Sequence, residues 1–332
     1  MMDWQQINEK IASSGRILLT SHENPDGDGL GSAVAMYHHL CEKGKECRII
    51  NCSQLPEEYD FLNHDSIIEM YAAEEHDEWL RNCDLAIIFD VGAFSRLRGI
   101  KDAIDRYDIK TVNIDHHPHP DDHPFTINVV DTNAAATGAM VYDYLKEYRE
   151  KPLSKNICEG IYTAVMTDTG SFRYSNTNTK CHEIAIECLN AGVETSKIYQ
   201  RIYETKPQSS IRLLARVIEN ISFENDGELA WFSIDQNMLD AAEASSKDVD
   251  GFTDFIRTIK GVEVAVMVFE NGRDVCRINF RSQGKYVIND IAKHFGGGGH
   301  KFAAGAVIKG NKETIVPQVI SQTIASLERQ AT

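Results

Sequence analysis

The chain has 332 residues, 42% of them hydrophobic and 25% charged, which is ordinary for a folded protein and long enough for two domains. Its 50 acidic and 34 basic residues give a net charge of -16, which argues against coating of a nucleic-acid backbone and makes any phosphate site local. No apolar run approaches the roughly 18 residues of a membrane span. The first residues also lack a leader pattern, so we expect a cytoplasmic protein without a membrane partner. The eight cysteines form no CxxC pair and are expected to be buried thiols.

Short apolar runs alternate with helical patterns in the first half of the chain. This rhythm predicts an α/β domain, a parallel sheet with helices on both faces. We place this domain at residues 1–192, with Gly192 as a helix stop, and a helical connector at residues 193–218. The apolar runs cover residues 16–20, 47–51, 85–90 and 110–115, and the helical patterns cover residues 30–41, 136–167 and 179–190.

Residues 219–332 predict a smaller mixed α/β domain. Its charge differs from that of the first domain: residues 1–192 carry a net charge of -15 and residues 193–332 a net charge of -1. Ten basic and four acidic residues lie between positions 257 and 312. We therefore expect one domain to attract cations and the other an anion. The expected strands are 229–234, 262–269 and 274–280, followed by a helix at 287–295 and a last strand and helix within 304–327.

Potential metal ligands follow three of the apolar runs in the first domain. His22 follows the first run, Asp90 ends the third, and Asp115 and His116 stand at the end of the fourth. Because the carboxyl ends of parallel strands line the ligand crevice of an open sheet, we expect these side chains to gather there. Several carboxylates with imidazoles favour a pair of transition-metal ions, which a shared carboxylate such as Asp90 would bridge.

Simpler interpretations exist for each of these segments. Residues 24–27 alone predict a turn. A calcium loop counted from Asp26 fails at its fifth position, Leu30, and at its twelfth, Tyr37. A zinc-binding tract is a further alternative for the histidines at positions 116, 117, 119 and 123.

These residues resemble the DHH phosphoesterase superfamily. The resemblance rests on the pattern His-x-x-x-Asp-x-Asp at positions 22–28, on Asp90, on Asp115-His116-His117 and on Asp168. In the second part, residues 279–282, 291–295 and 296–305 are similar to the DHH-associated domain with its glycine-rich substrate loop. The glycine run does not fit the dinucleotide fingerprint, since Lys301 stands where the third glycine belongs. The resemblance covers nearly the whole chain.

The resemblance implies a role for each matching residue. One divalent ion would be held by His22, Asp26 and Asp90, and a second by Asp28, Asp90, His116 and Asp168. Manganese is the expected metal, with magnesium or cobalt as alternatives. His117 and Asp115 would be catalytic, His117 beside the scissile phosphate and Asp115 by orienting a metal-bound imidazole. Substrate binding is expected from Arg281, Gly296, Gly297, Gly298, Gly299 and His300, unless Arg281 only pairs with a local carboxylate such as Asp290.

The resemblance also implies a function. The chain is similar to NrnA-type oligoribonucleases, which hydrolyse very short RNA and remove the 3′-phosphate of 3′-phosphoadenosine 5′-phosphate by two-metal activation of water. The expected partner is a short RNA or nucleotide, and a homodimer stays open. A stand-alone cyclic- or linear-dinucleotide phosphodiesterase is the first alternative. A non-catalytic nucleotide or metal sensor is the second, although no ligand of the motif is missing.

Overall fold

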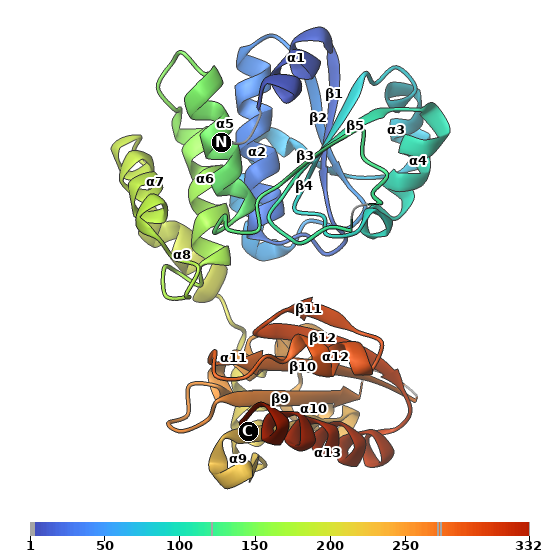
Figure 1. The fold of residues 1–332 in the computed structure, drawn as a ribbon, viewed down its shortest axis with the longest axis vertical. Coiled ribbons are helices and arrows are strands. Elements are labelled where there is room, and N and C mark those ends of the chain that lie inside the picture. The colour runs from blue at the N-terminus through green and yellow to red at the C-terminus, as the bar shows by residue number, and fades with distance from the viewer. Residues whose placement is uncertain (1–3, 121, 271, 273, 332) are drawn as a thin grey trace. The chain divides into compact units, whose positions relative to one another are not determined.

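A computed structural model describes residues 4–120, 122–270, 272 and 274–331. The chain forms two units, Met1–Thr205 and Lys206–Thr332 (Figure 1). The expected connector is divided between them. Helix α8 (Thr195–Tyr203) buries Ile198 in the core of the first unit, whereas α9 (Gln208–Glu219) buries Leu213 in that of the second. In the part of the chain that is described, no helix is both long and apolar enough to cross a membrane.

The first unit is built on a sheet of six parallel strands in the order β3-β2-β1-β4-β5-β6, which confirms the predicted parallel sheet. The two edge strands were not predicted. They are short and largely half-buried, so they lack the continuous apolar run that marks the central strands. The strands are β1 (Arg16–Ser21), β2 (Glu46–Asn51), β3 (Ile68–Met70), β4 (Leu85–Phe89), β5 (Lys110–Asp115) and β6 (Ile127–Val130).

Helices cover both faces of this sheet, as predicted, because successive strand residues point to opposite sides. Ile17 and Leu19 belong to a core that they share with α1, α2, α5, α6 and α7, of which α7 packs on α5 and α6, whereas Leu18 belongs to the core under α3 and α4. Figure 1 shows the two groups on opposite sides of the sheet. The helices are α1 (Gln5–Ser13), α2 (Gly27–Glu42), α3 (Ala73–Leu80), α4 (Gly99–Tyr107), α5 (Thr137–Tyr148), α6 (Lys155–Asp168) and α7 (Thr179–Asn190), with 3₁₀ segments at Glu57–Leu62, His64–Ser66 and Phe94–Leu97.

Two glycines let α2 and α6 touch through their backbones. A Cβ atom added to Gly31 would lie 2.3 Å from the carbonyl oxygen of Gly160, and one added to Gly160 would lie 2.5 Å from that of Gly31. No side chain fits in this space. The contact matters for the site described below, because α2 carries Asp28 in its first turn and α6 ends at Asp168.

We expect Gly160→Ala to destabilise the protein by about 1–3 kcal/mol, since the overpacking outweighs the better helix propensity of alanine. Urea unfolding followed by circular dichroism measures the change. Gly15→Ala is the control, because a Cβ atom there makes only an ordinary 3.6 Å contact with Asp84. Equal stability of the Gly160 variant and the wild type would contradict a backbone-to-backbone contact.

The second unit holds a mixed sheet in the order β11-β12-β10-β9-β8-β7, which confirms the predicted mixed domain. Among the strands described in this unit, β8 and β9 pair in parallel and the other neighbours pair antiparallel. Gly298 and Gly299, expected in a loop, instead belong to a short edge strand paired with β12. The strands are β7 (Ser222–Glu224), β8 (Leu229–Ile234), β9 (Val264–Glu270), β10 (Val275–Ser282), β11 (Gly298–His300) and β12 (Ala303–Lys309).

Two helix groups pack on this second sheet. Helices α12 and α13 cover the face that carries Val266, Ile278 and Phe280, and α9, α10 and α11 cover the opposite face over β8 and β9. The sequence predicted α12 and α13, but not α10 and α11, which are too short to show a helical period. The helices are α10 (Gln236–Ala242), α11 (Phe252–Ile256), α12 (Asn289–His294) and α13 (Lys312–Ala331), with 3₁₀ segments at Asn225–Gly227 and Ser246–Val249.

Candidate metal centre and substrate-binding segment

Three neighbouring strands deliver the first groups of the site. His22 follows β1, Asp90 follows β4, and His116 comes one residue after Asp115 at the end of β5. Between β1 and β4 the strand order reverses, and ligands of open α/β sheets bind at this switch point. In the structure these side chains gather at the carboxyl edge of the sheet, as predicted.

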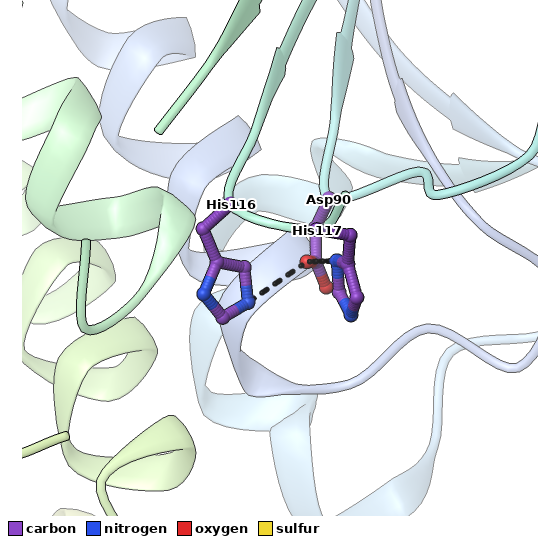
Figure 2. Close-up of side chains that lie close together, drawn as sticks. All are labelled: Asp90, His116 and His117. Atoms are coloured by element: carbon purple, nitrogen blue, oxygen red, sulfur yellow. Dashed lines mark ion pairs between the residues drawn. The ribbon is translucent and has the colours of Figure 1, made fainter. Parts of the chain in front are cut away.

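Asp90 lies at the centre of the cluster. One of its carboxylate oxygens is 3.4 Å from Nε2 of His22. The other is 3.6 Å from Nε2 of His116 and 3.2 Å from Nδ1 of His117, as Figure 2 shows. The side chain is buried, and its backbone has φ 61°, a left-handed conformation that is uncommon outside glycine. Such strain at a strand end is typical of positions where the site dictates the backbone.

The start of α2 supplies two further carboxylates. Asp26 is the N-cap of this helix, and its Oδ1 accepts hydrogen bonds from the backbone N–H groups of Asp28 and Gly29 at 3.0 and 3.2 Å. Its Oδ2 lies 3.8 Å from Nε2 of His22. A Cβ atom on Gly29 would come within 2.0 Å of Ser21 Oγ, so only glycine lets the helix start this close to β1.

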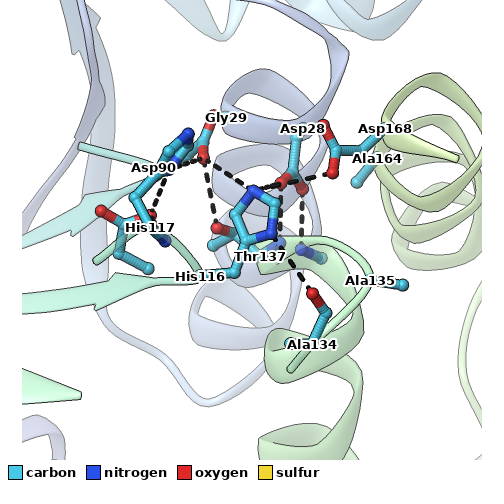
Figure 3. Close-up of polar contacts among 12 residues, drawn as sticks. Asp28, Gly29, Asp90, His116, His117, Ala134, Ala135, Thr137, Ala164 and Asp168 are labelled. Atoms are coloured by element: carbon cyan, nitrogen blue, oxygen red, sulfur yellow. Dashed lines mark hydrogen bonds and ion pairs between the residues drawn. The ribbon is translucent and has the colours of Figure 1, made fainter. Parts of the chain in front are cut away.

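Asp28 is held by the start of α5. Its two oxygens accept hydrogen bonds from the backbone N–H groups of Thr137 and Gly138 at 2.7 and 2.8 Å (Figure 3). These bonds fix the side chain and give the buried carboxylate its partners. Nε2 of His116 lies 3.7 Å from Asp28 and 3.6 Å from Asp168. The carboxylates of α2 and α6 therefore both face Nε2 of this imidazole.

The outer ring nitrogens of both imidazoles have acceptors. Nδ1 of His22 lies 2.7 Å from the carbonyl oxygen of Glu23, and Nδ1 of His116 lies 3.3 Å from that of Ala134. With the proton on Nδ1, each ring directs the lone pair of Nε2 toward the carboxylates, the arrangement of metal-binding histidines. Arg96 also places Nη2 2.8 Å from Nδ1 of His22 and gives up that contact when Nδ1 carries the proton.

The donor set fits divalent ions. Three groups of potential ligand atoms lie within 4.8 Å of one another: His22, Asp26 and Asp90; Asp28, His116 and Asp168; and Asp90, His116 and His117. The distances of 3.4 to 3.8 Å between imidazole and carboxylate atoms are long for hydrogen bonds. They are close to the separation of about 3 to 3.5 Å between two ligands that each lie about 2.1 Å from one ion.

The electrostatics of the cluster also call for cations. Burial, followed by repulsion from Asp90, raises the pKa of Asp28 and of Asp168 well above the usual range. Burial disfavours the charged form of His22, yet the neighbouring carboxylates of Asp26 and Asp90 raise its pKa to about 9. Asp28 and Asp168 therefore hold a proton more readily than an ordinary carboxyl group does, which reduces their repulsion from Asp90. Divalent ions would supply the same compensation, and metal binding would release these protons.

His117 differs from His116 in what holds it. Its Nδ1 lies 2.8 Å from Asp115 Oδ1, which also accepts the backbone N–H of His117 at 3.0 Å. Burial opposes the charged imidazolium, but hydrogen bonds with Asp115 and Asp90 raise the pKa of His117 to about 11. The ring is 23% exposed, more than the 8% of His116.

Asp115 is hydrogen-bonded to two imidazoles, those of His117 and His119. Its two oxygens contact Nδ1 of His117 at 2.8 Å and Nε2 of His119 at 2.6 Å. That Asp115 orients a metal-bound imidazole stays a prediction; the imidazoles that it contacts belong to His117, a possible ligand beside Asp90, and to His119. This carboxylate is completely buried, and its bond to His119 holds it in place while its bond to Nδ1 fixes the ring of His117.

The second unit holds the expected substrate-binding residues on adjacent strands. Arg281 of β10 pairs with Ala303 of β12, which in turn pairs with His300 of β11. Arg281 Nε donates to Asp254 Oδ2 at 3.2 Å. Arg281 does pair with a carboxylate, as the alternative held, but the partner is Asp254 and not Asp290, which binds Lys293 at 3.0 Å. Gly296 has a positive φ of 75°, and a Cβ atom on Gly297 would clash with the carbonyl oxygen of Gly305 at 2.1 Å.

Sequence reasoning missed the groups that hold the ligands. The N–H groups of Thr137 and Gly138 belong to the backbone, so the residue types at these positions do not indicate that they bind Asp28. His119 stood only in the zinc-tract alternative, although its spacing of four residues from Asp115 was a usable signal. Asn176 donates through Nδ2 to the carbonyl oxygens of Ala135 and Asp168 at 3.0 and 3.1 Å, and nothing in its sequence context indicated this.

The fold and this cluster together define a two-unit protein with a candidate dinuclear metal centre at the switch point of a parallel sheet. Comparison with family models agrees: residues 16–165 match the N-terminal domain of the DHH family, and residues 235–326 match the DHHA1 domain. The chain belongs to the DHH family, as its motifs predicted.

Known proteins show the same relationship. The chain is 30% identical to the bifunctional oligoribonuclease and PAP phosphatase NrnA of Thermus thermophilus, over 90% of this chain and 86% of that protein. An exopolyphosphatase-related protein from Bacteroides fragilis has a similar structure, with a TM-score of 0.89, 27% identity and coverage of 98% and 95% of the two chains. RecJ from Thermus thermophilus in complex with Mn²⁺ shares the fold, with a TM-score of 0.57, 11% identity and coverage of 98% of this chain and 54% of that one.

Proposed function

We propose that this protein is a metal-dependent phosphoester hydrolase that cleaves very short oligoribonucleotides and removes the 3′-phosphate of 3′-phosphoadenosine 5′-phosphate. One observation carries the proposal: four aspartates and two histidines from five segments converge at the carboxyl edge of the sheet, with Asp90 between the two groups. The relative from Thermus thermophilus, named for both activities, supports the choice of substrate. The complete ligand set favours an enzyme over a non-catalytic sensor.

The residues have separate tasks in this reaction. Two divalent ions, when bound, would activate a water molecule and neutralise charge on the phosphoryl oxygens. Thr137 and Gly138 keep Asp28 in a single position through their N–H groups, so the ligands need little rearrangement. His117, with Nδ1 fixed by Asp115, would present Nε2 to the phosphate and donate a hydrogen bond or a proton to the leaving oxygen. We infer manganese as the metal because imidazole ligands join the carboxylates.

A substrate panel tests the proposed function. The full chain with manganese is assayed on a diribonucleotide, a longer RNA, 3′-phosphoadenosine 5′-phosphate, a cyclic dinucleotide and pyrophosphate. We expect turnover of the diribonucleotide and the bisphosphate, and slow turnover of the longer RNA. Preference for the cyclic dinucleotide would favour the dinucleotide phosphodiesterase instead, and inactivity on all five substrates would refute a hydrolase.

The homodimer and the cytoplasmic location, expected from the sequence, stay predictions.

Arg281→Ala and His300→Ala are expected to raise the KM for a diribonucleotide about tenfold, because each removes a cationic or hydrogen-bonding group from the proposed phosphate contact. Metal content should not change, since both residues belong to the second unit. Steady-state kinetics with metal analysis measures both effects. Lys309→Ala, on the exposed end of β12, is the charge control. Wild-type KM and kcat in both variants would show that these residues do not bind the substrate.

A further inference from the structure

One face of the second sheet is covered over only part of its width. Ala265, Met267 and Phe269 of β9 lie under the helices of that face and are buried. On the same face, the next strand carries Arg277 and Arg281, each with a side chain that is 32% exposed. Farther along, Val307 of β12 is 67% exposed. Strands β10, β12 and β11 therefore present an open shelf beside α11.

The middle row of this shelf runs across three strands. Asn279 pairs with Gly305, and Gly305 pairs with Gly298, so these residues lie side by side on one face. Beyond Asn279 the row carries no side chain. A Cβ atom on Gly298 would meet nothing within 4 Å, so the space above this glycine is open.

Asn279 has a half-buried side chain at one end of this row. A Cβ atom on Gly305 would lie 3.6 Å from its Oδ1, so the carboxamide borders the glycine row. Among the described residues, no hydrogen-bond partner of this carboxamide is found. A half-buried amide usually finds a partner in the protein or in a ligand, because leaving it unpaired costs free energy.

The two neighbouring rows carry anchored arginines. Arg277 donates to Asp250 at 3.0 Å, and Arg281 donates to Asp254 at 3.2 Å. Both carboxylates lie at or next to α11, so they hold the guanidinium groups toward the helix side of the shelf. The two arginines are four residues apart on β10, which separates their rows by about 13 Å. The slot between these two rows has the backbone of Gly305 and Gly298 as its base.

We infer that this slot binds the nucleobase of a substrate nucleotide and that Asn279 reads its edge. The carboxamide offers one donor and one acceptor side by side, the pattern that adenine complements with N7 and N6. Glycines let a flat ring approach the backbone, and Arg281 and His300 in the adjacent row would meet the phosphate of the same nucleotide. This assignment rests on the proposed function for the class of ligand, and it adds base selection by Asn279.

Binding of 5′-AMP, 5′-GMP and ribose 5-phosphate to the full chain in EDTA tests the inference without requiring hydrolysis. We expect AMP to bind at least about tenfold more tightly than ribose 5-phosphate, the effect of one bidentate base contact. Asn279→Asp should lower the affinity for AMP about tenfold and raise the affinity for GMP, because a carboxylate accepts hydrogen bonds from the two adjacent donors of guanine. Gly298→Val should abolish the advantage of AMP by filling the slot. Neither change should alter the affinity for ribose 5-phosphate.

Asn311→Asp adds the same charge to an exposed position of the second unit and should leave all three affinities unchanged. AMP binding that is undetectable, or no tighter than that of ribose 5-phosphate, would overturn the inference. So would an equal loss of AMP and ribose 5-phosphate in Asn279→Asp, because that result reports charge repulsion and not base reading. Failure of the proposed function would appear separately, as absent hydrolysis with manganese while the base preference persists.

Discussion

Asp90→Asn is expected to reduce metal binding at both positions and to lower kcat for a diribonucleotide by about a thousandfold or more. Asp90 lies between His22 at 3.4 Å and His116 at 3.6 Å, so loss of its charge weakens both ligand groups at once. The metal-dependent charge stabilisation that is lost amounts to several kcal/mol, and each 1.36 kcal/mol is a factor of ten in rate. Metal content by mass spectrometry, with single-turnover kinetics, measures the effect.

Asparagine is the informative replacement at this position. It tolerates the left-handed backbone that Asp90 adopts, whereas alanine would add strain and obscure the loss of charge. Asp102→Ala, which removes an exposed carboxylate of α4 in the same unit, is the control and should retain metal and activity. Full occupancy of both metal positions in Asp90→Asn, with unchanged turnover, would show that Asp90 does not bridge them.

The sequence predicted that the candidate ligands cluster because their position is encoded locally. His22, Asp90 and His116 each follow an apolar run, and parallel strands bring such ends to one edge whatever the order of the strands. The strand order itself did not need to be known. The same reasoning predicted the central strands, whose continuous burial leaves a plain apolar signal, and missed β3 and β6, whose half-exposed residues leave none.

What holds the ligands could not be predicted in this way. Asp28 and Thr137 are 109 residues apart, and the group that binds Asp28 is a backbone N–H that every residue except proline possesses. Arg281 illustrates the same difficulty for side chains. A carboxylate near it in sequence was the natural candidate, but the register of β10 and the position of α11 select Asp254 instead. Such partners depend on tertiary packing, which periodicity does not encode.

His117→Ala is expected to lower kcat for a diribonucleotide by about 100- to 10,000-fold while metal content stays near that of the wild type. His116 directs Nε2 to Asp28, Asp90 and Asp168, whereas His117 is fixed through Nδ1 by Asp115 and is more exposed. The KM should change little, because the effect falls on the chemical step. His116→Ala is the matched comparison and should lose metal together with activity.

A variant of Asp115, measured for kcat and metal content in the same way, distinguishes a residue that positions His117 from a residue that binds metal. Asp115→Asn should lower kcat by about 10- to 100-fold, less than the loss of His117 itself, because the ring remains but is held less firmly. His119→Ala should have a smaller effect, since His119 contacts the other oxygen of Asp115. If His117→Ala loses metal while His116→Ala retains it, the two imidazoles have exchanged roles. His117 would then be the ligand, which its distance of 3.2 Å from Asp90 also permits.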